Sequence, residues 1–183
     1  MKKVILMLVV ALSVMSASAQ IKVGANAGLQ VPTEDGAKLG FGGAISGEYL
    51  LLNESLGVGL NVGFYAFGGE SYEEDGIEIS GSSFLIPVAL TGRYYFLTEA
   101  IRPYAGVDLG LYNLGYKITA KFMGESASDT ETVSKFGLAP VIGLQYGLSS
   151  ALALDVNAKY NLIFTEGKST NIIGFNVGVV YKF

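Results

Sequence analysis

The stretch Gly174-Phe175-Asn176-Val177-Gly178-Val179-Val180-Tyr181-Lys182-Phe183 alternates between two kinds of side chain. Its odd-numbered residues are all aromatic or aliphatic, whereas its even-numbered residues, Val180 apart, are glycine, asparagine or lysine. Successive side chains of a β-strand point to opposite faces, so this period of two residues predicts a strand. One face of that strand is apolar and the other is small or polar, which indicates that the two faces meet different environments.

The same period recurs along the chain from residue 21 onward. The alternating segments cover residues 21–31, 39–51, 56–64, 83–96, 106–111, 135–146, 152–161 and 174–183. They make about eight strands, most of them near the ~10 residues that a tilted membrane-spanning strand needs. The stretches between them lack the spacing of apolar residues that is typical of an amphipathic helix. The chain beyond residue 20 is therefore predicted to be all-β.

The connections between these segments alternate in length. Short links lie at residues 52–54, 97–100 and 149–150, and longer polar links lie at residues 32–38, 68–80, 118–134 and 165–170. Short turns at one end and long loops at the other are typical of a transmembrane β-barrel, whose chain ends both lie beside the short periplasmic turns. The sequence therefore predicts an eight-stranded antiparallel up-and-down transmembrane β-barrel.

Aromatic residues on the apolar face distinguish a membrane barrel from a soluble one. One group falls near the lower ends of the strands and consists of Tyr49, Tyr94, Phe96, Tyr146, Tyr181 and Phe183. A second group falls near the upper ends and consists of Phe41, Phe64, Phe84, Phe136, Tyr160 and Phe175. The same face is aliphatic between the two groups, which matches the aromatic girdles at the two interfaces of a membrane barrel. A soluble sandwich core would instead scatter its aromatic residues without such bands.

Composition excludes much of enzyme chemistry. The chain has 183 residues and no cysteine, histidine or tryptophan, and 15% of its residues are charged, against about 25% in a typical soluble domain. Without cysteine and histidine there is no disulfide, no thiolate nucleophile, no common general base and no usual ligand for a transition metal. We therefore expect no enzyme, no catalytic residue, no metal and no cofactor. A mechanism that uses only the carboxylate of Asp108 or Asp155 is the remaining enzymatic alternative, and an internal salt bridge is the better interpretation.

The N-terminal residues have the three parts of a secretory signal peptide. Lys2 and Lys3 supply the positive region, residues 4–12 the apolar region, and Ala17 and Ala19 the small residues that a signal peptidase reads. A retained membrane anchor and a buried N-terminal helix are the alternatives. We expect cleavage, so that residues 1–19 form a signal peptide and residues 20–183 form the barrel domain of an exported protein. The formal net charge of −4 argues against nucleic acid as a partner.

The polar face of the predicted strands carries charges of both signs. They include Glu48, Arg93, Asp108, Asp155, Lys159 and Lys182. The interior of an eight-stranded barrel is narrow and nearly filled by side chains, and buried charges need partners, so we expect the first five to form a charge network in the lumen. Glycines on the same face leave room for inward rings, which are predicted to be Tyr65, Tyr95, Tyr104 and Tyr112.

These features resemble the small outer-membrane barrels of the OmpX and OmpA type, and most of all the porin-like outer-membrane barrel family that is common in Bacteroidota. The segments that carry the resemblance are Phe84-Leu85-Ile86-Pro87-Val88, Tyr94-Tyr95-Phe96, Arg102-Pro103-Tyr104-Ala105-Gly106, Gly143-Leu144-Gln145-Tyr146 and the final alternating strand. The resemblance implies a location in the cell outer membrane, in contact with lipid and lipopolysaccharide. It also implies that Tyr181 and Phe183 carry the signal read by the outer-membrane assembly machinery.

Three functions are consistent with the sequence. The first is a structural or interaction protein with a largely plugged lumen, whose long surface-exposed loops contact a partner. The second is a narrow porin-like channel for small solutes or ions, which glycines on the inner face favour and opposite charges in a small lumen oppose. The third is a soluble periplasmic barrel that binds a small ligand, in which the apolar face would point inward.

Overall fold

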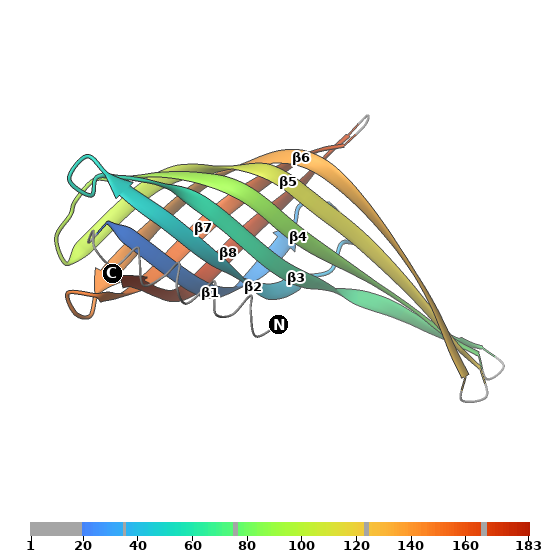
Figure 1. Cartoon of the computed structure of the whole chain (residues 1–183). Helices are drawn as coiled ribbons and strands as arrows, with labels where there is room; N and C mark the ends of the chain where they lie inside the picture. The colour runs from blue at the N-terminus through green and yellow to red at the C-terminus, as the bar shows by residue number, and fades with distance from the viewer. Residues whose placement is uncertain (1–19, 35, 75–76, 123–124, 166–167) are drawn as a thin grey trace, which may run out of the picture.

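The computed structural model describes residues 20–34, 36–74, 77–122, 125–165 and 168–183, and in it the chain forms one closed barrel (Figure 1). Its eight strands are β1 (Ile21–Pro32), β2 (Gly40–Leu51), β3 (Leu56–Glu74), β4 (Ile77–Tyr95), β5 (Ile101–Phe122), β6 (Glu125–Gly147), β7 (Leu152–Thr165) and β8 (Lys168–Lys182). Each strand pairs antiparallel with the next, and β8 pairs with β1 to close the barrel. The predicted fold class is confirmed. The predicted signal peptide, with Ala17 and Ala19, lies outside the described residues.

The period of two residues sorts the side chains onto the two faces as predicted. Antiparallel register sets Val177 beside Ala27 and Asn176 beside Gly28, so residues of one kind share a face across the β1–β8 seam. The apolar face is the outer one: Phe41 is 69% exposed, whereas Glu48 on the same strand is 4% exposed. A soluble carrier needs the opposite arrangement, because an apolar exterior of this extent is unfavourable in water. The structure thus contradicts the soluble-barrel alternative.

The three short links form tight turns at the same end of the barrel as the C-terminus (Figure 1). They connect β2 to β3, β4 to β5, and β6 to β7, as the sequence predicts. The first of them contains three consecutive non-glycine residues with positive φ, namely Leu52, Asn53 and Glu54. Residues other than glycine rarely adopt this left-handed backbone conformation, so contacts of the turn with the rest of the barrel must stabilise it.

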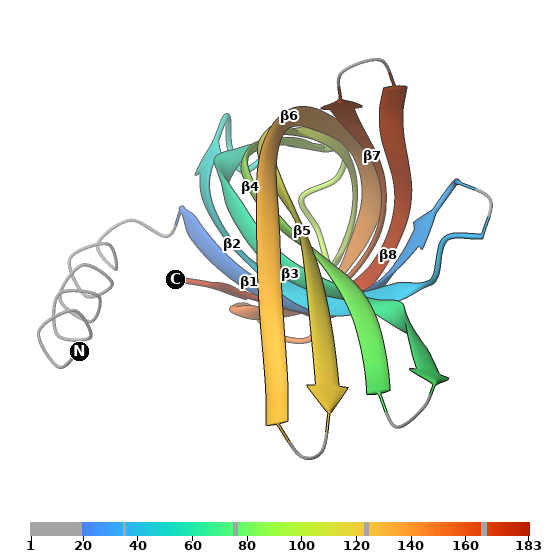
Figure 2. The ribbon, with the colours of Figure 1, turned by 90° about the vertical axis from the view of Figure 1, so that its right-hand side faces the viewer.

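Three of the four long polar links are strand rather than loop, which corrects the prediction. Within the predicted loops at residues 68–80, 118–134 and 165–170, β3 pairs with β4 as far as Glu74 and Ile77, β5 with β6 as far as Phe122 and Glu125, and β7 with β8 as far as Thr165 and Lys168. The hairpins project beyond the barrel at the end opposite the short turns, and Figure 2 shows the β3–β4 and β5–β6 hairpins on one side and the β7–β8 hairpin on the other. Residues 127–134 lack the alternation, because a strand without a buried face does not need it, whereas Tyr116, Ile118 and Ala120 on β5 keep it and were a signal for the strand.

Within the described part of the chain, no helix is both long and apolar enough to span a membrane. The same residues contain no group of three or more acidic, histidine or cysteine side chains that would hold a metal ion.

Candidate functional site in the barrel lumen

Tyrosine rings packed over glycines fill much of the lumen. The ring of Tyr65 covers Gly63, Tyr95 covers Gly57, Tyr104 covers Gly143 and Tyr112 covers Gly137. A Cβ at position 63 would lie 2.9 Å from the Tyr65 ring, and one at position 137 would lie 2.8 Å from the Tyr112 ring. Both distances are too short for carbon atoms, so the rings occupy space that a side chain larger than hydrogen would need. The predicted placement of the four rings is confirmed.

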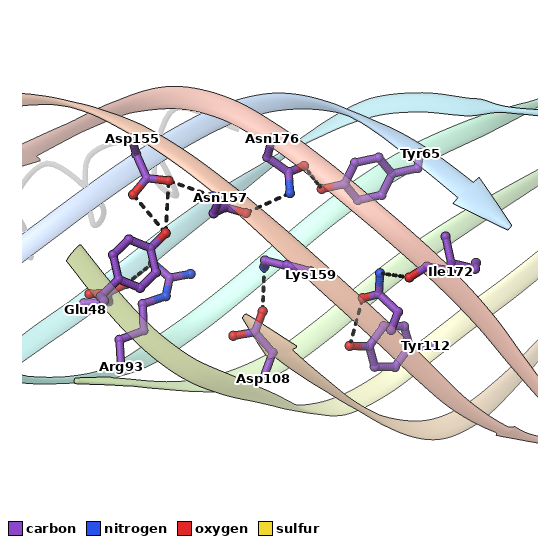
Figure 3. Close-up of polar contacts among 12 residues, drawn as sticks. Glu48, Tyr65, Arg93, Asp108, Tyr112, Asp155, Asn157, Lys159, Ile172 and Asn176 are labelled. Atoms are coloured by element: carbon purple, nitrogen blue, oxygen red, sulfur yellow. Dashed lines mark hydrogen bonds and ion pairs between the residues drawn. The ribbon is translucent and has the colours of Figure 1, made fainter. Parts of the chain in front are cut away.

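Glu48 on β2 and Arg93 on β4 form an ion pair inside the lumen, over the intervening strand β3 (Figure 3). Tyr95 donates a second hydrogen bond to the Glu48 carboxylate over 2.6 Å, and the Arg93 guanidinium lies 5.3 Å from the centre of the Tyr104 ring. Both charged side chains are at most 5% exposed. Removing two charges from water is costly, and the mutual attraction, the phenol hydrogen bond and the ring face offset that cost.

Lys159 on β7 and Asp108 on β5 form a second ion pair, with 2.6 Å between Lys159 Nζ and Asp108 Oδ2. Among the described residues, the other carboxylate oxygen of Asp108 has no hydrogen-bond partner, and neither has the side-chain nitrogen of Asn61. Both residues line an enclosed cavity of about 10 Å³, which is room for about one water molecule. The Lys159–Asp108 pair therefore lies beside a cavity that is small compared with the side chains around it.

Asp155 is surrounded by neutral donors. Its carboxylate accepts hydrogen bonds from the Tyr104 hydroxyl at 3.0 Å and from Asn157 Nδ2 at 2.7 Å (Figure 3). It accepts a third from Gln145 Nε2 at 3.1 Å. The five predicted network residues thus form two ion pairs and one separate carboxylate that is solvated by amides and a phenol. Hydrogen bonds of this kind stabilise a buried negative charge without a cation.

Sequence reasoning missed two features of the lumen. Lys22 is 4% exposed, donates to Gln145 Oε1 at 3.0 Å and lies 3.9 Å above the centre of the Tyr95 ring. Its place on the polar face of the first alternating segment was a signal for this. The second feature is an apolar cluster towards the projecting hairpins, formed by Tyr65, Leu85, Tyr112, Ile163 and Ile172. Leu85 and its apolar neighbours on β4 interrupt the alternation, which concealed the inward face.

A third charged group lies at the end of the barrel that carries the short turns, which we call the inner rim. Glu54, in the turn between β2 and β3, accepts hydrogen bonds from Lys182 and from Arg102 Nη1, the latter at 2.9 Å. Lys182 therefore pairs at the rim and not with the charges deeper in the lumen. Burial alone would raise the pKa of Glu54, but the hydrogen bonds from Lys182 and Arg102 outweigh it and hold that pKa below its ordinary value.

The two residues of the predicted assembly signal lie at the end of β8. The Tyr181 and Phe183 rings contact each other edge to face, with 4.9 Å between their centres. Tyr181 is 48% exposed and points outward from the barrel, in line with the lower aromatic band.

The chain belongs to the outer-membrane β-barrel family, because residues 4–183 match the family described as outer membrane protein beta-barrel domain. A curated uncharacterized protein of Haemophilus influenzae is 28% identical over 96 residues, which are 52% of this chain and 51% of that protein. The chain thus spans about half the length of that relative.

Solved structures of outer-membrane proteins share the fold. Neisserial surface protein A is 21% identical with a TM-score of 0.58, and the match covers 91% of this chain and 98% of that one. Ail of Yersinia pestis is 20% identical with a TM-score of 0.55, covering 90% and 98%. A major outer membrane protein of Thermus thermophilus is 15% identical with a TM-score of 0.55, covering 89% and 99%. At these identities the likeness concerns the fold alone.

Proposed function

We propose that this protein is a plugged outer-membrane barrel that presents its projecting hairpins to a partner outside the cell. It reaches the outer membrane after export and removal of residues 1–19, and the assembly machinery reads Tyr181 and Phe183. Lipid and lipopolysaccharide contact its apolar exterior. The proposal includes no catalysis, since the chain has neither histidine nor cysteine to supply the usual base or nucleophile.

The observation that carries the proposal is the filled lumen. Two ion pairs lie inside the barrel together with two apolar clusters, which between them contain the four tyrosine rings. The cavity lined by Asp108 and Lys159 holds about 10 Å³, whereas a conducting path needs a continuous column of water. A barrel with such an interior serves better as an anchor than as a pore.

The hairpins supply a surface for interaction. In the described part of the chain, β7 pairs with β6 only from Gly137 onward, so residues 127–134 of β6 form the free edge of the projecting sheet. A strand that is paired on one side only presents backbone N–H and C=O groups on its other side, and a strand of a partner can add there.

The first experiment is single-channel recording of the refolded protein in a planar bilayer, with the shift in gel migration on heating as the check of folding. We expect a folded barrel without conductance steps. Reproducible steps that change when Arg93 or Asp108 is neutralised would overturn the plugged barrel and establish the narrow channel, with those residues in its pathway.

The direction of the hairpins is tested by single cysteines, which the natural sequence allows because it has none. Thr130→Cys is expected to react with a membrane-impermeant maleimide on intact cells, whereas Ser150→Cys in the β6–β7 turn reacts only after lysis. Labelling of Ser150→Cys alone on intact cells would contradict an outward-facing hairpin. Equal labelling of both variants on intact cells would contradict it as well, because the short turn would then be accessible from outside.

A further inference from the structure

Two lysines face each other at the inner mouth of the barrel, which is its opening at the end with the short turns. Lys22 on β1 and Lys182 on β8 are partners in the antiparallel register, and both side chains point to the interior. Like charges directly opposite each other on neighbouring strands destabilise a sheet. Glu54 pairs with Lys182, whereas Lys22 donates to the neutral Gln145, so the two lysines have more positive charge than this carboxylate offsets and attract a further anion.

A cavity of about 310 Å³ opens beside these lysines. Lys22, Lys182 and Arg102 all line it, and Glu99 is the one carboxylate among its described lining residues. The β6–β7 turn forms the opposite wall with Ser149 and its neighbours. Three cations against Glu99 and the adjoining Glu54, which pairs with two of them, leave the cavity a net positive charge, and its volume admits a small ligand rather than a single ion.

Glu54 supplies a carboxylate to two of these cations from a separate element. It does not line the cavity itself, but it accepts hydrogen bonds from both Arg102 and Lys182. It does so from a turn in which it and the two residues before it have φ values of 69°, 53° and 51°, all left-handed. The ion pairs of Glu54 thus hold a disfavoured backbone conformation, and an anion that replaced its carboxylate would release the turn.

We propose that the inner-mouth cavity binds an oxyanion group, a carboxylate or a phosphate, which competes with Glu54 for Arg102 and Lys182. Lys22 contributes the third positive charge. The Arg102 guanidinium matches either group, because its planar donors fit two oxygens at once. The cavity involves neither the plugged lumen nor the projecting hairpins, so an experiment can contradict anion binding without contradicting the proposed function, and the reverse.

The test is a titration of the isotopically labelled protein in detergent micelles, followed by the backbone amide NMR signals of residues 149–152 and of Lys22. Inorganic phosphate and acetate are the two probes, and sodium chloride at equal ionic strength is the control. We expect saturable shifts with at least one probe. Saturation by phosphate alone assigns the site to phosphate groups, and saturation by acetate alone assigns it to carboxylates.

The variants test the competition. Glu54→Gln is expected to bind the probe about two- to fivefold more tightly, which is the range set by partly exposed ion pairs. Lys182→Gln and Arg102→Gln lose saturable binding, and Lys117→Gln on a projecting hairpin removes a matched charge without effect. If Lys182→Gln fails to refold, Arg102→Gln supplies the same comparison.

Three results would overturn the proposal. The first is a response to both probes that equals the response to chloride, which is screening alone. The second is unchanged affinity in Glu54→Gln, which removes the competition. The third is retained binding in Arg102→Gln, which places the anion elsewhere.

Discussion

Neighbouring residues of β4 point to opposite faces of the barrel wall, and these two faces have different surroundings. Val88 on the outer face is 42% exposed and lies in the aliphatic belt, whereas Thr91 and Arg93 on the inner face are at most 5% exposed. In a soluble protein the apolar face would be the buried one. Here lipid takes the place of water outside, so the buried interior is the polar face, and it is the face where a lost partner is most costly.

The largest effect is expected for Arg93→Met. The variant leaves the Glu48 carboxylate buried without its cation, and breaking a buried ion pair costs about 3–5 kcal/mol. The free energy of unfolding, measured by urea titration in lipid vesicles with far-UV circular dichroism, is expected to fall by that amount.

The double variant Glu48→Leu/Arg93→Met is the control for this effect. It replaces both charges with apolar groups of similar size and is expected to regain most of the loss. A double variant as unstable as Arg93→Met would show that the loss comes from the guanidinium contact with Tyr104 and from the Tyr95 hydroxyl, whose acceptor is Glu48, and not from an unpaired charge.

On the outer face of the same strand, Val88→Arg is expected to cost about 2–4 kcal/mol, the cost of an arginine at the middle of the membrane on a barrel exterior. Thr130→Arg places the same side chain on an exposed projecting hairpin and is expected to change stability by less than about 0.5 kcal/mol. The same unfolding titration measures both variants. Equal effects would mean that the belt around Val88 does not face lipid.

The sequence predicts the faces and the turns because period two is a strong signal wherever lipid meets one face and packed side chains the other. It predicts the hairpins poorly, since residues such as those around Thr130 meet water on both sides and need no alternation. Which polar side chains pair inside the lumen depends on how the strands are staggered when the barrel closes. Asp155 faces amides rather than a cation because of the stagger between β5, β6 and β7, which no local pattern of residues records.

Glycines provide a smaller contrast between the faces. Gly143 points inward beneath the Tyr104 ring, whereas Gly47 points outward with open space where a Cβ would lie. Gly143→Ala forces the ring to move and is expected to cost about 1–3 kcal/mol, the usual cost of overpacking. Gly47→Ala is expected to be neutral or to stabilise the strand by up to about 1 kcal/mol. A reversed order in thermal unfolding would contradict the role of glycine as space for the rings.

The smallest effect is expected at the rim, where neither lipid nor a packed lumen surrounds the charge. The pKa of Glu54 is lowered by its bonds to Lys182 and Arg102, so the carboxylate stabilises the fold above the ordinary pKa of a glutamate. That stabilisation is lost as the pH falls through the lowered pKa of the folded state, where protonation breaks both ion pairs. Because the three side chains are partly exposed, the loss is expected to be at most about 1 kcal/mol. The free energies of unfolding of the natural chain and of Glu54→Gln, measured against pH, should therefore be similar in acid and differ at pH values above the pKa of a glutamate. Parallel curves would place the anion that stabilises Arg102 and Lys182 elsewhere.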